Sequence, residues 1–163
     1  MKLALDTSVL LTIFNREEGA ERWLEALIEA RREARFVVCE VVYAELAPAF
    51  SEQTELVETL GNLGVRFDPI QPDSAWLAGE IFRKYRRAGG PREYMIPDFL
   101  VAAHAQEQAD ALAAIDRGYL RSYFPDLALL RVRTRASGQT STSRGRPGRA
   151  STAAPWWFAK AAM

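Results

Sequence analysis

The chain has 163 residues, 48% hydrophobic and 10% aromatic, which fits one compact domain; its single cysteine, Cys39, excludes an internal disulfide and a thiolate-based metal site. The formal charge is zero, but all 21 acidic residues lie at or before Asp126, so residues 1–130 hold 14 basic against 21 acidic residues, a formal charge of −7. The acidic charge of residues 1–130 counts against electrostatic attraction of nucleic acid to the surface as a whole. Any contact with nucleic acid therefore needs a local basic patch or metal ions.

The first third of the chain alternates between apolar runs and amphipathic segments. Residues 2–5, KLAL, predict a strand, and residues 7–14, TSVLLTIF, predict a short helix. A second helix is predicted within residues 17–34, and residues 36–39, FVVC, predict the second strand. The apolar side of that second helix comprises Ala20, Trp23, Leu24, Leu27 and Ile28.

The acidic residue Asp6 and the charged stretch at residues 15–22 interrupt the apolar N-terminus. The uninterrupted run is therefore too short for a signal peptide or a membrane span. We expect a cytoplasmic protein that makes no membrane contact.

The middle of the chain continues the alternation. Residues 40–50 predict a helix that Pro48 ends or kinks. Residues 51–64 predict another helix, with glycines at its C-terminal end. Residues 65–70, VRFDPI, predict the third strand, and residues 72–90 predict a long helix. The buried side of that long helix comprises Leu77, Ala78, Ile81, Phe82 and Tyr85.

The last folded part supplies one helix and two strands, at residues 96–109, 111–116 and 128–132. Strands that alternate with helices indicate a three-layer α/β/α domain with a central parallel sheet of about five strands. In residues 134–152, 15 of 19 residues are Ser, Thr, Gly or Arg, so we expect a folded domain over residues 1–132 and a disordered tail over residues 133–163.

Four acidic residues fall where the predicted plan brings chain segments together. Asp6 and Asp116 follow strands, Asp98 begins a helix, and these positions share the carboxyl edge of a parallel sheet. Glu45 lies within the apolar run VVYAEL, so we expect its side chain to point inward. Crowded carboxylates repel one another unless a hard divalent cation binds them, so the pattern indicates Mg²⁺, with Mn²⁺ as a second candidate. Such ions can promote attack of water on a phosphodiester.

These segments resemble the PIN-domain ribonucleases, and among them the VapC-type toxins of bacterial toxin–antitoxin pairs. The resemblance covers residues 1–132 and lies in four motifs: LDTSVLL, VVYAEL, PDFLVAAHA and AAIDRGYL. It implies a metal-dependent endoribonuclease in which Asp6, Glu45, Asp98 and Asp116 are catalytic residues and metal ligands. Thr7 or Ser8 would supply a supporting hydroxyl.

The chain departs from the family pattern at two positions, which leaves open whether one or two ions bind. Ala114 stands where many members carry Thr or Ser, and Gly118 stands where some carry another acid. The resemblance also implies an RNA substrate, a cognate antitoxin protein and a homodimer.

Several alternatives fit individual residues. Asp6 and Asp98 are each typical of helix caps. His104, the one histidine, is more typical of a residue that packs or faces water than of a general base. The basic stretch RKYRRAGGPRE at residues 83–93 fits an RNA-binding patch and a solvated helix end equally well. For the whole chain, a non-catalytic PIN-like binding module is one alternative. An Asp-dependent phosphohydrolase is another. That chemistry resembles an Asp-x-Asp start, but the residue two positions after Asp6 is Ser8.

Overall fold

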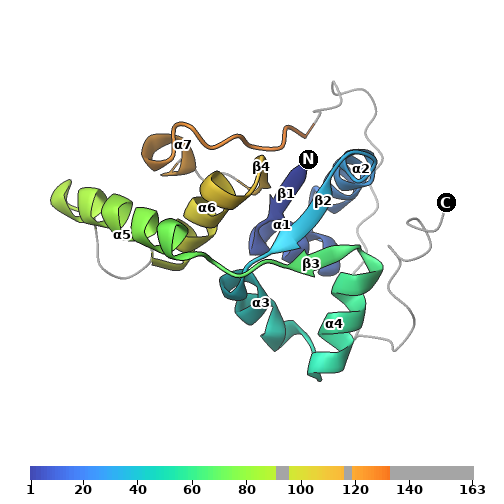
Figure 1. Ribbon diagram of the computed structural model, residues 1–163. Helices are drawn as coiled ribbons and strands as arrows, with labels where there is room; N and C mark the ends of the chain where they lie inside the picture. The colour runs from blue at the N-terminus through green and yellow to red at the C-terminus, as the bar shows by residue number, and fades with distance from the viewer. Residues whose placement is uncertain (91–95, 116–118, 133–163) are drawn as a thin grey trace.

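A four-stranded parallel sheet lies at the centre of the protein in the computed structural model, which describes residues 1–90, 96–115 and 119–132 (Figure 1). The strands are β1 (Lys2–Leu5), β2 (Arg35–Val38), β3 (Val65–Phe67) and β4 (Ala111–Ala113), in the order β3-β2-β1-β4. β1 pairs with β2 and β4, so its carboxyl end lies in the middle of the sheet edge. The predicted parallel α/β architecture is confirmed.

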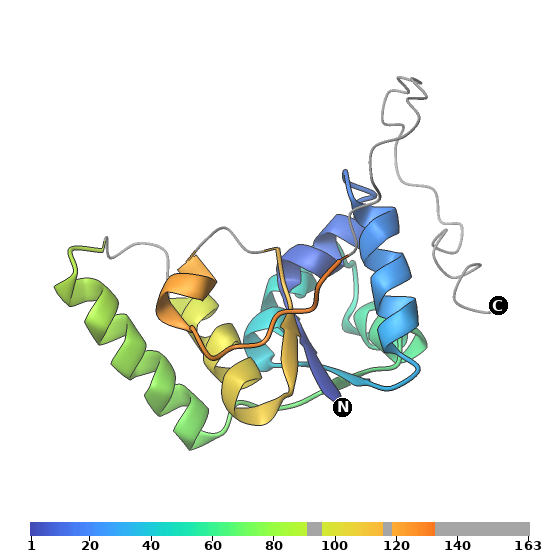
Figure 2. The same ribbon diagram turned by 90° about the horizontal axis from the view of Figure 1, so that it is seen from above.

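Helices cover both faces of this sheet, as the view from above shows (Figure 2). In chain order they are α1 (Thr7–Phe14), α2 (Ala20–Ala30), α3 (Glu40–Leu46), the 3₁₀ turn η1 (Ala47–Ala49), α4 (Gln53–Asn62), α5 (Pro72–Arg87), α6 (Ile96–Gln108) and α7 (Tyr119–Tyr123). α1 and α2 lie on one face, and α5 and α6 lie on the other. None of the described helices is long and apolar enough to cross a membrane.

The core has a layer on each side of the sheet. Leu5 and Phe36 face α1 and α2, where Leu10 and Leu24 are almost fully buried. On the other side, Phe99 of α6 is fully buried among four aromatic rings whose centroids lie 5.6 to 5.9 Å from its own. These rings belong to Phe82, Tyr85, Tyr123 and Phe124. Burial of a side chain of this size contributes about 2 kcal/mol or more, so Phe99 anchors the first turn of α6.

The predicted fifth strand is reduced to a single bridge between Leu129 and Leu112 of β4. Two hydrogen bonds of 2.8 Å flank it, from Leu112 N to the Ala128 carbonyl and from Leu130 N to the Leu112 carbonyl. β4 is three residues long, so it offers little length for a further strand to pair with.

Two details of the helices also differ from or extend the prediction. Ile28 is 39% exposed, because α2 buries Leu24 and Leu27 and Ile28 lies at the margin of that stripe. Pro48 lies in η1, directly after α3 ends at Leu46, so the predicted break at this proline is confirmed. The predicted tail, residues 133–163, lies outside the described residues.

Candidate functional site

Asp6 stands between the end of β1 and the start of α1. It is the N-cap of α1, since its Oδ1 accepts a hydrogen bond from the Ser8 backbone N–H at 2.9 Å and another from the Ser8 hydroxyl. The helix-cap interpretation of Asp6 is therefore confirmed, but both of these bonds end on Oδ1. Among the described residues no Lys or Arg forms an ion pair with this half-buried carboxylate, so Oδ2 keeps capacity for a further partner.

Ser8 also joins this turn to the end of β4. Its Oγ accepts a hydrogen bond from the Ile115 N–H at 3.1 Å, and the Asp6 N–H donates to the Ala113 carbonyl at 2.9 Å. The chain segments that follow β1 and β4 are therefore hydrogen-bonded to each other at the carboxyl edge of the sheet. The predicted site residue Asp116 follows Ile115 directly but lies outside the described residues.

Glu45 reaches the same turn from α3. The Thr7 hydroxyl donates a hydrogen bond to Glu45 Oε2, and Thr7 itself is buried. The expectation that Glu45 points inward is wrong, because α3 buries Val42 and Leu46 and leaves Glu45 exposed. An exposed carboxylate needs no buried counter-charge. The apolar residues around Glu45 belong to the other side of α3, which packs on the core.

Asp98 lies in the first turn of α6 and is half-buried. The neighbouring Phe99 anchors this turn in the core, and α6 packs against β1 and β4. Hydrogen bonds thus join Asp6 to Ser8 and Ser8 to Ile115, and the adjacent Thr7 to Glu45, while Asp98 lies on a helix turn that Phe99 anchors. Within residues 1–90, 96–115 and 119–132, no three His, Cys, Asp or Glu side chains form a group that could hold a metal ion.

Cys39 lies at the end of β2 as the N-cap of α3 and is 1% exposed. Burial raises the pKa of its thiol above the usual value, an effect larger than the opposing hydrogen bonds from the Val42 and Val41 N–H groups. The thiol therefore stays protonated near neutral pH and acts as a small core residue.

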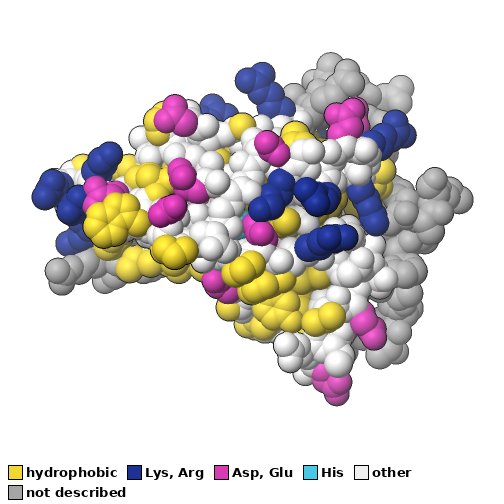
Figure 3. Space-filling model, in the orientation of Figure 1, with side chains coloured by type: hydrophobic (Ala, Val, Ile, Leu, Met, Phe, Trp, Pro, Cys, Tyr) yellow, Lys and Arg dark blue, Asp and Glu magenta, His cyan; other side chains and the backbone are white. Residues whose placement is uncertain are grey.

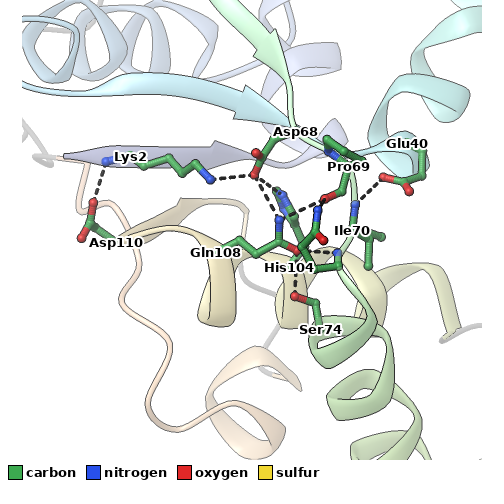
Figure 4. A network of polar contacts seen from close by, with 10 residues as sticks. Lys2, Glu40, Asp68, Pro69, Ile70, Ser74, His104, Gln108 and Asp110 are labelled. Carbon is green, nitrogen blue, oxygen red and sulfur yellow. Dashed lines mark hydrogen bonds and ion pairs between the residues drawn. The ribbon is translucent and has the colours of Figure 1, made fainter.

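A second polar cluster, centred on Asp68 and His104, connects β1, the end of β3 and α6 (Figure 4). Asp68 Oδ2 lies 2.8 Å from His104 Nε2 and 2.9 Å from Lys2 Nζ, and His104 is 1% exposed. Burial acts to raise the pKa of Asp68, but the hydrogen bonds and charges of Lys2 and His104 outweigh it and lower the pKa below its usual value. Of the two placements expected for His104, packed or facing water, the structure shows the packed one.

Gln108 extends this cluster to the start of α5. Its Nε2 donates to the Pro69 carbonyl at 3.0 Å, and its Oε1 accepts from the Gln71 N–H and the Ser74 hydroxyl at 2.8 Å each. The cluster therefore holds α6, and with it Asp98, against the link between β3 and α5. The place of Asp68 was not predicted, because an acid before a proline is typical of a turn. The one available signal was a single histidine in an apolar helix, which needs a polar partner.

The fold is similar to that of chains in several solved complexes. At 19% sequence identity, 79% of this chain aligns with 97% of a chain from VapBC2 of Rickettsia felis bound to a promoter DNA fragment, with a TM-score of 0.58. The same identity and share of this chain apply to VapBC-1 of nontypeable Haemophilus influenzae, with 96% of that chain covered and a TM-score of 0.59. FitAcB of Neisseria gonorrhoeae gives 19% identity, 79% and 96% coverage and a TM-score of 0.55.

Comparison with curated protein sequences gave no match. A family model for the PIN domain matches residues 3–124, a span that runs from β1 to the end of α7. This span includes the hydrogen-bonded turn at Asp6, the α3 residue Glu45 and the first turn of α6. The chain therefore belongs to the PIN domain family.

Proposed function

We propose that this protein is a Mg²⁺-dependent endoribonuclease, with Mn²⁺ as an alternative ion, and that it is the toxin of a toxin–antitoxin pair. The observation that carries the proposal is the hydrogen-bonded turn at the carboxyl edge of the sheet. There, Ser8 connects Asp6 to the exit of β4, and Thr7 holds Glu45 beside the same turn. In open α/β sheets this edge is where ligands bind.

The donor set fits a hard divalent cation. Asp6, Glu45, Asp98 and Asp116 would hold it, and carboxylate oxygens are the ligands that Mg²⁺ prefers. Hydrogen bonds from the described residues reach Oδ1 of Asp6 and Oε2 of Glu45, which leaves one oxygen of each carboxylate for an ion. Neither carboxylate forms an ion pair with a Lys or Arg among those residues, so a cation would offset negative charge that the described protein does not.

The protein's own residues would position the reaction. Ser8 orients the Asp6 carboxylate by bonding Oδ1 twice, and buried Thr7 limits the positions open to exposed Glu45. A bound ion would supply an activated water and would stabilise charge on the leaving oxygen of the phosphodiester. Asp98, in the first turn of α6, would complete the carboxylate set.

The partner is proposed from the structural neighbours, which are PIN-fold chains from VapBC and FitAcB complexes. We propose a cognate antitoxin protein, a homodimer of this chain and a cytoplasmic location. The non-catalytic alternative keeps the same fold and partner but makes no cut in RNA, and the phosphohydrolase alternative acts on small phosphate esters.

Sequencing of RNA ends after brief expression in bacterial cells tests the proposal. The wild-type chain should arrest growth and create new RNA ends at defined sites, whereas Asp6→Asn should do neither at equal protein level. Asp73→Asn is a matched control, because Asp73 is an exposed acid in the first turn of α5, and it should behave as wild type. Equal RNA ends in wild-type and Asp6→Asn cells would contradict the proposal.

A further inference from the structure

Three basic side chains from three neighbouring strands lie on one face of the sheet. Lys2 of β1 pairs with Arg35 of β2, and Arg66 of β3 pairs with Val37, two positions after Arg35. Because alternate residues of a strand point to opposite faces, Lys2, Arg35 and Arg66 share a face. α6 packs against β1 and β4, whereas Arg35 and Arg66 are exposed. Figure 3 shows dark-blue side chains gathered over this part of the sheet.

Arg31 lies at the same edge of the sheet but on its other face. A Cβ atom placed on Gly64, directly before β3, would lie 2.9 Å from the Arg31 guanidinium, and Arg31 lines a pocket with Phe36 and Val65 on the side of α1 and α2. We call Lys2, Arg35 and Arg66 the sheet-face cluster. Among the described residues Lys2 is paired with Asp68, while Arg31, Arg35 and Arg66 form no ion pair. The two arginines of the cluster, with Arg31 near the same edge, thus present uncompensated positive charge on an acidic body.

We propose that the sheet-face cluster binds the phosphate backbone of single-stranded RNA, as a contact surface separate from the carboxylate site. The proposal rests on the proposed function, because it assigns this surface to the RNA substrate. Arginine binds phosphate through a planar guanidinium, and neutralisation of phosphates releases counterions from the nucleic acid.

Charge decides against two other occupants of this surface. The chain's own tail, residues 133–163, carries six basic residues and no acid, so the cluster repels it. A second copy of this chain would present the same cluster in a symmetric contact and would be repelled in the same way. Charge complementarity therefore favours an anionic polymer.

An aromatic pair at the β3 edge favours RNA over an acidic protein segment. Phe67 directly follows Arg66 on the edge strand β3, so its side chain points to the opposite face of the sheet, where its ring is 55% exposed and meets that of Tyr43 edge-on at 5.8 Å. Because β3 is an edge strand, an RNA strand that crosses this edge can contact both faces. In Figure 3 a hydrophobic area adjoins the basic side chains. Surfaces that bind single-stranded nucleic acid combine cations for the backbone with aromatic rings on which bases stack.

The other basic region of the described chain, at the end of α5, is less available. Arg83 pairs with Glu80 at 2.5 Å, and Arg86 donates to the Gly90 carbonyl. These arginines bind groups of α5 and of the segment that follows it. They also lie at the C-terminal end of α5, where the helix dipole favours cations. The end of α5 is therefore the matched comparison for the sheet-face cluster.

Fluorescence anisotropy with a labelled single-stranded RNA in EDTA tests the proposal, because it measures binding without cleavage. The double variant Arg35→Gln/Arg66→Gln should bind about tenfold more weakly at low salt, and its log–log salt slope should fall by about 1.4 for two lost phosphate contacts. Arg83→Gln/Arg87→Gln should change both quantities less. Equal affinity and slope for wild type and the sheet-face variant, or an equal loss in the control, would overturn the proposal.

Two further arms separate the possible occupants. Phe67→Ala should weaken RNA binding about fivefold or more but leave polyphosphate binding unchanged, because polyphosphate has no bases to stack. If the sheet-face variant loses affinity for polyglutamate and keeps its affinity for RNA, the surface serves an acidic protein and the RNA proposal is overturned. If wild type binds RNA through the cluster but makes no cut with Mg²⁺, the proposed catalytic function fails while the binding surface stands.

Discussion

Thr7 donates a hydrogen bond from its buried hydroxyl to the exposed carboxylate of Glu45, 38 positions further along the chain. Thr7 is the first residue of α1 and follows Asp6 directly, so this bond ties the place of Glu45 on α3 to the place of Asp6 at the end of β1. Two carboxylates from separate elements thereby keep a defined spacing before any ion binds. Thr7 is thus a positioning residue in the proposed site.

Thr7→Val should lower kcat for RNA cleavage by about tenfold or more, because a misplaced catalytic group costs at least as much as the ~1 kcal/mol of the lost hydrogen bond. Thr7→Ser keeps the hydroxyl and should restore most of the rate. Thr12→Val is a matched control, since Thr12 is a second buried threonine of α1 whose hydroxyl donates to a glutamate, Glu17, at 3.3 Å. Measurement of kcat, KM and Tm for all three variants checks this. Wild-type kcat in Thr7→Val would contradict the positioning role.

Asp6→Asn and Asp98→Asn should each abolish RNA cleavage while leaving Tm in EDTA unchanged or raised. Asn keeps the shape and an oxygen that can cap a helix, and it removes one of several negative charges from a metal-free carboxylate site. Asp73→Asn, in the first turn of α5, should keep the wild-type cleavage rate. If Asp6 only capped α1 and Asp98 only served the first turn of α6, cleavage would survive and stability would change by ~1 kcal/mol. A cleavage assay beside thermal melts in EDTA distinguishes these outcomes.

Asp68→Asn should destabilise the protein at neutral pH, and the difference from wild type should shrink in acid. The pKa of Asp68 is lowered by folding, so its carboxylate contributes stability above its unfolded pKa, and that contribution is lost as the pH falls through the folded pKa. The free energy of unfolding, measured for both proteins between about pH 7 and pH 3, checks this. A difference that stays constant over this range would show that the Asp68 charge adds nothing to its bonds with Lys2 and His104.

A chain that ends at Val132 should unfold cooperatively and keep its kcat. The tail's six basic residues could contribute nonspecific attraction to phosphates, so truncation should weaken RNA binding modestly and make it less dependent on salt. Urea unfolding and RNA binding of the truncated and full chains test this. Loss of the cooperative transition would mean that residues 133–163 pack on the domain.

The sequence predicts the fold well where one periodicity dominates. β1 and α1 match the predicted bounds, residues 2–5 and 7–14, because a buried apolar run stops at an acid that caps the next helix. α7 was not predicted, since five residues are too few to display a helical period. The segment around Leu129 was predicted as a strand from its apolar letters, but its partner β4 is three residues long, and only a bridge forms.

The candidate site was predictable in part, for a related reason. Asp6 lies at the boundary between β1 and α1, and Asp98 lies in the first turn of α6; the ends of such elements can be inferred from local pattern. The orientation of Glu45 depends on which side of α3 meets the core, which VVYAEL does not reveal because apolar residues occur on both sides. The contact between Asp68 and His104 joins residues 36 positions apart and depends on the path of the chain from β3 to α5. No local pattern encodes that path.

The measurement that tests the central claim most directly is cleavage of single-stranded RNA by the full-length protein after removal of bound metal. The protein should cut RNA when Mg²⁺ or Mn²⁺ is added, should be inactive in EDTA, and should recover with excess Mg²⁺ and no need for Zn²⁺, because its proposed ligands are carboxylate oxygens. Asp6→Asn should stay inactive under every condition. Full cleavage in EDTA by metal-free wild-type protein, or cleavage by Asp6→Asn at the wild-type rate, would contradict the account.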